Sequence, residues 1–179
     1  SKNYDVFISF RGEDTRTNFT SHLHTSLSQN SLRTFIDYQL PKGDDISESL
    51  IEAIKGSSIS VVVFSENYAS SKWCLDELAQ ILQCRKDSGQ FVIPVFYKVD
   101  PSDVRKQKGA YEEAFAKHER DLGHNQDKLK KWKDALFETA NLAGWHSQSF
   151  RDESELIQNI VNDVMQKLDH RHPSILEGL

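Results

Sequence analysis

The feature that most constrains this sequence is a run of six residues, 59–64, in which only Ser60 is not Ile, Val or Phe. A short run of β-branched and aromatic residues is typical of a strand that is buried on both faces, as in parallel sheets covered by helices. The run is also far shorter than the roughly 20 apolar residues that span a bilayer. It therefore predicts the central strand of an α/β domain, and no transmembrane helix is expected.

Similar runs recur along the chain and alternate with helical patterns. The other predicted strands are residues 4–9, 34–36, 91–96 and, more weakly, 144–146. The predicted helices begin at Asp14 or Thr15, at Ser47 or Ser49 (ending at Gly56), at Ser70 or Ser71, at Gly109, at Lys128 and at Ser154. Five strands joined by right-handed crossovers predict a flavodoxin-like, doubly wound parallel sheet in the order 2-1-3-4-5 with helices on both faces.

The length and charge of the chain indicate one acidic domain. Its 179 residues carry 22 Lys and Arg against 27 Asp and Glu, a net charge of -5. We expect the domain to occupy residues 1–169 and residues 170–179 to form a tail towards a following domain; no signal peptide is visible at the start. The acidic balance argues against a dedicated nucleic-acid binder. The lysines of residues 128–133 form either a local basic patch or, as we favour, a solvated helix face.

Ligands of such sheets bind beyond the carboxyl ends of the strands, which directs attention to the loops 10–16, 37–46, 65–72 and 97–108. The glycines form neither G-x-G-x-x-G nor G-x-x-x-x-G-K-[ST], so a Rossmann or P-loop enzyme is not expected. The histidines show no zinc-binding spacing, and we predict no metal site. In the first loop, Arg11 and Arg16 could hold phosphate oxygens. An ordinary capping loop is the alternative, because Glu13 and Asp14 suit a helix N-terminus.

The third predicted helix carries an unusual carboxylate. On a helical wheel of about 100° per residue, Glu77 falls at the border of the apolar face, and Trp73 is its i, i+4 neighbour. The spacing predicts an aromatic ring beside a carboxylate near a strand end. From periodicity alone, a salt bridge at the rim of the core is the better interpretation of Glu77.

Three motifs in this order resemble the plant Toll/interleukin-1 receptor (TIR) domain of nucleotide-binding leucine-rich-repeat disease-resistance receptors. They are YDVFISFRGEDTR at residues 4–16, VFSENYASSKWCLDEL at 63–78 and PVFYKVDPSDVR at 94–105. The resemblance runs from about residue 4 to residue 168. The fold that it implies is the flavodoxin-like one reached above.

The resemblance implies a self-associating enzyme that cleaves the bond from NAD⁺, or NADP⁺, to nicotinamide. The products would be ADP-ribose and cyclic or variant ADP-ribose signals in plant innate immunity and cell death. Glu77 matches the catalytic glutamate of the family, and no separate cofactor is implied. The residues that would bind the dinucleotide are Arg11, Gly12, Arg16, Trp73, Lys42, Gly43 and Asp44. The loop 37–46 resembles a mobile loop beside the family's cleft but departs from the family pattern at Tyr38.

The resemblance also implies other TIR domains as partners, and the cytoplasm or the nucleus as the location. Ser21 and His22 match a pair on the first helix that packs against the first and last helices of a neighbour. Gly144 matches a glycine at a second self-association face; on local grounds a helix C-cap is as good an interpretation.

Two other functions remain open at this point. One is a non-catalytic adaptor that signals by assembly alone. The other is synthesis of 2′,3′-cyclic nucleotides from nucleic acid, which is linked in the family to the motif cysteine, here Cys74. The helical wheel places Cys74 within the apolar face, which favours a core role.

Overall fold

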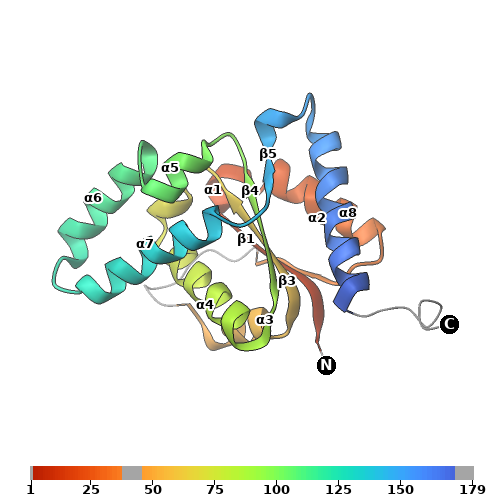
Figure 1. Ribbon diagram of the computed structural model, residues 1–179, viewed down its shortest axis with the longest axis horizontal. Coiled ribbons are helices and arrows are strands. Elements are labelled where there is room, and N and C mark those ends of the chain that lie inside the picture. Colours follow the sequence, from red (N-terminus) through yellow and green to blue (C-terminus); the bar gives the residue numbers. More distant parts are fainter. Residues whose placement is uncertain (1, 38–45, 172–179) are drawn as a thin grey trace.

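The computed structural model describes residues 2–37 and 46–171, with side chains up to residue 169 (Figure 1). Its centre is a sheet of five parallel strands in the order β2-β1-β3-β4-β5, which confirms the predicted topology. The strands are β1 (Tyr4–Phe10), β2 (Thr34–Phe35), β3 (Ser57–Phe64), β4 (Phe91–Phe96) and β5 (Trp145–His146).

Helices cover both faces of the sheet. They are α1 (Gly12–Thr15), α2 (Phe19–Gln29), α3 (Glu48–Lys55), α4 (Lys72–Ser88), α5 (Pro101–Lys106), α6 (Ala110–Leu122), α7 (Gln126–Ala140) and α8 (Glu153–Arg171), with the 3₁₀ turns η1 (Tyr68–Ser70) and η2 (Ser147–Ser149). Figure 1 shows α2 and α8 together on one side and α4 and α7 on the other. None of the helices within residues 2–37 and 46–171 is long and apolar enough to cross a membrane.

Every residue of β3 is buried, as expected for a central strand. Its alternate side chains enter two separate apolar clusters. Val62 and Phe64 pack with α3, α4, α6 and α7, whereas Ile59 and Val61 pack with α2 and α8. This alternation follows from the twofold periodicity of a strand and explains why the run is apolar without interruption by charge.

Several predicted helix starts are confirmed and others are wrong. Ser47 and Ser71 cap α3 and α4, accepting hydrogen bonds from Leu50 N and Cys74 N, and Gly56 ends α3. The predicted start of the first long helix at Asp14 or Thr15 is wrong, because the short helix α1 ends there and Asn18 caps α2 instead.

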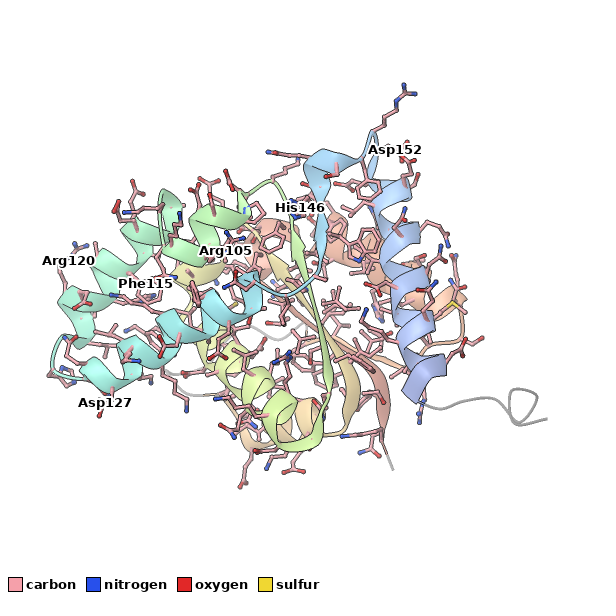
Figure 2. All side chains as sticks on the ribbon, in the orientation of Figure 1. Arg105, Phe115, Arg120, Asp127, His146 and Asp152 are labelled. Carbon is pink, nitrogen blue, oxygen red and sulfur yellow. The ribbon has the colours of Figure 1, made fainter. Side chains whose placement is uncertain are left out.

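The last helix and one loop also differ from expectation. The α8 N-terminus is capped by Asp152 rather than Ser154, since Asp152 Oδ1 accepts from Glu155 N; Figure 2 shows Asp152 at this end of the helix. The segment predicted as the loop 97–108 contains α5. Asp100 caps α5 and Pro101 occupies its first turn, a start signal that the sequence contains. Helix α8 extends to Arg171, two residues beyond the predicted domain end at residue 169.

Gly144 has a packing role that the sequence did not reveal. It is not a helix C-cap, because α7 ends with Asn141 in that position. A Cβ atom at Gly144 would overlap the carbonyl oxygen and the ring of Pro94 on β4. Since β5 begins at Trp145 and pairs with Val95, the absence of a side chain at Gly144 lets β5 reach the sheet.

We predict that Gly144→Ala lowers the free energy of unfolding of the monomer by about 3 kcal/mol, because backbone of β4 cannot move aside as a side chain would. Gly89→Ala is the matched control: its Cβ meets nothing within 4 Å, and only its positive φ of 66° is unfavourable, at about 1 kcal/mol. Urea denaturation at low protein concentration measures both. A Gly144→Ala protein as stable as the wild type would instead favour a role confined to self-association.

Candidate active site

A cleft lies at the carboxyl end of β1, where segments distant in the sequence meet. Its lining comes from β1 and the α1 segment, from Asp37 after β2, and from the first turns of α4. The cleft volume of about 70 Å³ is below the roughly 300–1,000 Å³ of pockets that enclose a whole ligand. A dinucleotide could therefore enter this cleft, as it stands, with one end only.

The cleft brings together five of the predicted site residues, namely Arg11, Gly12, Arg16, Trp73 and Glu77. Tyr38, Lys42, Gly43 and Asp44 lie outside the described residues. The three residues predicted for self-association are elsewhere: Ser21 and His22 are on α2, and Gly144 precedes β5.

The start of α4 is fixed over the end of β1 by hydrogen bonds from the preceding loop. Asp14 accepts hydrogen bonds from Ser65 Oγ at 2.5 Å and from the backbone and side-chain nitrogens of Asn67 at 2.8 and 3.0 Å. On the other side of the loop, the hydroxyl of Tyr111 donates to Ser65 O at 2.7 Å. Side chains of α1 and α6 thus both form hydrogen bonds to the loop between β3 and η1. These bonds fix the direction in which α4 leaves its cap at Ser71.

Glu77 is 5% exposed and accepts a hydrogen bond at each carboxylate oxygen. Ser9 Oγ donates to Oε1 at 2.7 Å, and the indole N–H of Trp73 donates to Oε2 at 3.0 Å. Burial raises the pKa of Glu77 to about 8, the two hydrogen bonds oppose that rise, and the nearby Asp37 adds to it. Among the described residues no cation forms an ion pair with Glu77. The predicted rim salt bridge is therefore wrong: the helix wheel found the position but not the partners.

The two arginines of the cleft flank the short helix α1. Arg11 Nη2 is 3.2 Å from Glu13 Oε2, and the Arg16 guanidinium carbon is 6.0 Å from the centre of the Phe10 ring. Gly12 makes room for Arg16, because a Cβ atom at Gly12 would overlap that guanidinium. The Nε atoms of Arg11 and Arg16 are both buried and have no hydrogen-bond partner among residues 2–37 and 46–171. Two guanidiniums with donors to spare are suited to oxygen-rich anions such as phosphate.

Cys74 is a core residue, as the wheel favoured. It is 3% exposed, and its thiol contacts Phe10 O at 3.5 Å. Burial, with Glu77 nearby, raises the pKa of this thiol to about 12. The thiolate that a cysteine nucleophile requires is accordingly scarce at neutral pH.

Sequence reasoning missed Ser9, Tyr68 and Asp37. Ser9 had a usable signal, because it is a polar residue on the face of β1 that also carries the buried Phe7. Tyr68 contacts Ser9 from η1, which no local pattern indicates.

The lysines on α7 do not form a free basic patch. Lys128 pairs with Asp76, Lys130 with Asp134, and Lys133 with Glu119. Asp76 on α4 is half-buried and also accepts a hydrogen bond from the indole N–H of Trp132. Within the described residues, no group of three or more His, Cys, Asp or Glu side chains gathers where it could hold a metal ion.

The sheet order and a cleft beside β1, where the direction of the strand order changes, define a flavodoxin-like α/β domain. The family model for the TIR domain matches residues 3–178, and the chain belongs to this family. It is 53% identical to the disease resistance protein RPV1 of Vitis rotundifolia over 92% of this chain, and 45% identical to the TMV resistance protein N of Nicotiana glutinosa over 98% of it. The chain spans only 12% of RPV1 and 16% of N.

Solved structures agree with this assignment. The TIR domains in a structure of the activated Roq1 resistosome, which recognises the effector XopQ, match with a TM-score of 0.84 and 48% identity over 90% of this chain and 99% of theirs. The TIR domain heterodimer of RPS4 and RRS1 matches with a TM-score of 0.54 and 22% identity over 91% of this chain and 96% of that one. The second likeness supports the fold alone.

We predict that the stability of the domain depends on pH through Glu77. Its pKa in the folded state, about 8, is above the ordinary 4.5, so the folded state binds more protons between these values. The contribution of the neutral carboxyl is complete below pH 4.5 and is lost as pH rises through 8, on the order of 5 kcal/mol.

The free energy of unfolding of the Glu77→Gln variant should not fall in this way as pH rises. Its free energy of unfolding, measured by urea denaturation from pH 5 to 9, should exceed that of the wild type increasingly as pH rises. Glu66→Gln, a change at an exposed carboxylate, is the control and should keep the wild-type dependence. Parallel curves for wild type and Glu77→Gln would show that Glu77 is ionised throughout.

Proposed function

We propose that this domain cleaves the N-glycosidic bond between nicotinamide and ribose in NAD⁺ or NADP⁺. The observation that carries the proposal is the buried Glu77 carboxyl, held by Ser9 and Trp73 in a cleft that also contains two arginines. The residues of the cleft suit two groups of the substrate, the ribose that carries nicotinamide and the diphosphate. In this arrangement the nicotinamide ribose would lie against Trp73 and Glu77, and the diphosphate against Arg11 and Arg16.

The reaction needs little machinery. Nicotinamide leaves as a neutral molecule when its bond to the ribose carbon breaks, so no group must protonate it, unlike ordinary glycosides that use two carboxyl groups. Water attacks the same carbon and releases a proton, which gives ADP-ribose, nicotinamide and H⁺. Attack by an atom of the adenine half instead gives a cyclic product.

The contribution of Glu77 is electrostatic. An ionised carboxylate stabilises the positive charge that develops on the ribose as nicotinamide leaves, and every ~1.4 kcal/mol of preference for the transition state gives a tenfold rate. Because the pKa of Glu77 is raised to about 8 by burial, most of the carboxyl is protonated at pH 7 in the empty cleft. The cationic nicotinamide ring of bound NAD⁺ favours the ionised form, so substrate binding itself would promote the active state.

We further propose that the domain signals in plant disease resistance by associating with other TIR domains. The relatives are disease resistance proteins, and one neighbour is a resistosome. His22 offers a 63% exposed side chain on α2, beside α8, and Ser21 is half-exposed. The second face near Gly144 and a cytoplasmic or nuclear location remain parts of this proposal, and the loop 37–46 remains part of the proposed dinucleotide site. The alternative is a non-catalytic adaptor, and the measurement of nicotinamide release below distinguishes it from the enzyme. No observation favours Cys74 as a nucleophile, because its thiol is buried and burial raises the pKa of that thiol.

We expect the purified domain to release nicotinamide from NAD⁺ at pH 8 under macromolecular crowding, measured by chromatography. Removing the carboxylate in Glu77→Gln should slow release about 10²- to 10³-fold, the usual effect of losing a preorganised electrostatic group. The control Glu66→Gln should keep the wild-type rate. Equal rates for wild type and Glu77→Gln would remove Glu77 from the mechanism, and no turnover by a crowded, assembled wild type would favour the adaptor.

The association surface has its own prediction. His22→Ala should weaken self-association about tenfold, measured by light scattering over a range of concentrations, because α2 loses an exposed side chain at the proposed contact. His24→Ala, on the same helix but half-buried, is the comparison. Unchanged association of His22→Ala would place the contact elsewhere.

A further inference from the structure

A line of polar atoms continues from Glu77 into the core. Ser9 Oγ, which donates to Glu77 Oε1 at 2.7 Å, lies 2.8 Å from the hydroxyl oxygen of Tyr68. That hydroxyl in turn lies 3.2 Å from the carbonyl oxygen of Cys74, to which it can donate. Both Ser9 and Tyr68 are 0% exposed. We call this series, from Glu77 Oε1 through Ser9 and Tyr68 to Cys74 O, the Ser9–Tyr68 relay.

Counting protons shows that the relay differs between the two charge states of Glu77. When Glu77 is ionised, the relay has three contacts but only two protons, those of the Ser9 and Tyr68 hydroxyls. Ser9 must donate to the carboxylate. Tyr68 then donates either to Ser9 or to Cys74 O, and donation to Ser9 strengthens the bond from Ser9 to the carboxylate. The Cys74 carbonyl lies within α4, where a helical N–H is available to it.

When Glu77 is neutral, its own proton completes the series. Trp73 can only donate, so it offers no acceptor to a proton on Oε2. A proton on Oε1 has Ser9 Oγ as its acceptor. Glu77 then donates to Ser9, Ser9 to Tyr68, and Tyr68 to Cys74 O, so that three protons fill three contacts. The direction of donation between Glu77 and Ser9 is reversed relative to the ionised state.

We propose that Ser9 and Tyr68 are positioning residues that hold the Glu77 carboxyl in the cleft and, by reversing their hydrogen bonds, accommodate both of its charge states in a buried site. The role of Ser9 and Tyr68 in catalysis rests on the proposed function, whereas their hydrogen bonds to Glu77 and to each other do not depend on it. Neither residue reaches the cleft surface as a substrate contact would require. Their effect on a reaction would pass entirely through Glu77.

The other charged or titratable groups near Glu77 come from every segment around the cleft. They are Arg11, Glu13 and Arg16 from the α1 segment, Asp37 after β2, Tyr68 from η1 and Cys74 from α4. Burial raises the pKa of Tyr68 well above its ordinary value and that of Cys74 to about 12, so both keep their protons while Glu77 titrates.

The test is a titration of the Glu77 carboxyl carbon by NMR from pH 5 to 10 in the 179-residue chain, with the signal assigned by its loss in Glu77→Gln. In Ser9→Ala the midpoint should rise by about one pH unit, because a hydrogen bond to the ionised form is roughly twice as strong as one to the neutral form. In Tyr68→Phe the midpoint should instead fall, because the neutral state loses both the acceptor of the Ser9 proton and the bond to Cys74 O, whereas the ionised state loses only the one bond that Tyr68 donates.

The chain provides matched controls for both variants. Ser60 is a buried serine on β3 whose hydroxyl has no partner, and Tyr111 is a buried tyrosine whose hydroxyl donates to Ser65 O. Ser60→Ala and Tyr111→Phe should leave the midpoint unchanged. The proposal is overturned if the Glu77 midpoint in Ser9→Ala equals that in Ser60→Ala. The role of Tyr68 is overturned if the midpoint in Tyr68→Phe equals that in Tyr111→Phe. Near-ultraviolet circular dichroism verifies folding, and Tyr68→Phe suffices if Ser9→Ala does not fold.

A second measurement separates the relay from the proposed function. Under crowding, the pH of half-maximal kcat/KM for NAD⁺ cleavage should move upward in Ser9→Ala together with the NMR midpoint. Shifted midpoints without any NAD⁺ cleavage, even in the wild type, would support the relay and refute the proposed function. Wild-type cleavage with unshifted midpoints would refute the relay and leave the function intact.

Discussion

The carboxyl group of Glu77 is buried between β1 and α4, and much of the surrounding structure serves to make that burial tolerable. A carboxyl taken out of water is destabilising unless it is neutral or well hydrogen-bonded. Here it receives bonds from Ser9 on the strand and Trp73 on the helix, so α4 must begin at one place and in one orientation. The Ser71 cap fixes the place, and the bonds from Asp14 to the preceding loop fix the orientation.

The topology of the sheet explains why the cleft forms where it does. In the order β2-β1-β3, the connections from β1 and from β3 run to opposite faces, α2 on one and α4 on the other. The loops that follow the two strands therefore separate, and the space between them opens above β1. One loop contributes Arg11 and Arg16 and the other leads to Trp73 and Glu77. The arginines and the Glu77 carboxyl thus line one cleft, and among the described residues no ion pair joins them.

The sequence predicted the features that depend on local pattern. The apolar run of β3, the Ser71 cap and the Trp73–Glu77 spacing were each sufficient to place an element or a pair, and the strand order followed from general rules of α/β topology. The partners of Glu77 were not predictable in this way: Ser9 is 68 positions away, and only the folded sheet brings it into contact. For the same reason a helix cap was as good a local interpretation of Gly144 as a self-association face, since nothing near it in the sequence indicates the approach of Pro94. The order Asp-Pro-Ser at residues 100–102 does contain a start signal for α5, within the segment predicted as a loop.

The two surfaces of interest lie on opposite faces of the sheet, with α2 and α8 on one side and α4 on the other (Figure 1). A partner seated on α2 and α8 would thus be separated from Glu77 by the sheet and could not add a side chain to its immediate surroundings. The direct structural link is the α1 segment, which carries both arginines of the cleft and leads into α2. Thr15 in α1 and Thr20 in α2 share a buried hydrogen bond of 2.6 Å, so the two helices are joined rather than merely adjacent. A displacement of α2 would accordingly reach Arg11 and Arg16 before it reached Glu77. Through this link, association would act on the two arginines of the cleft more directly than on the Glu77 carboxyl.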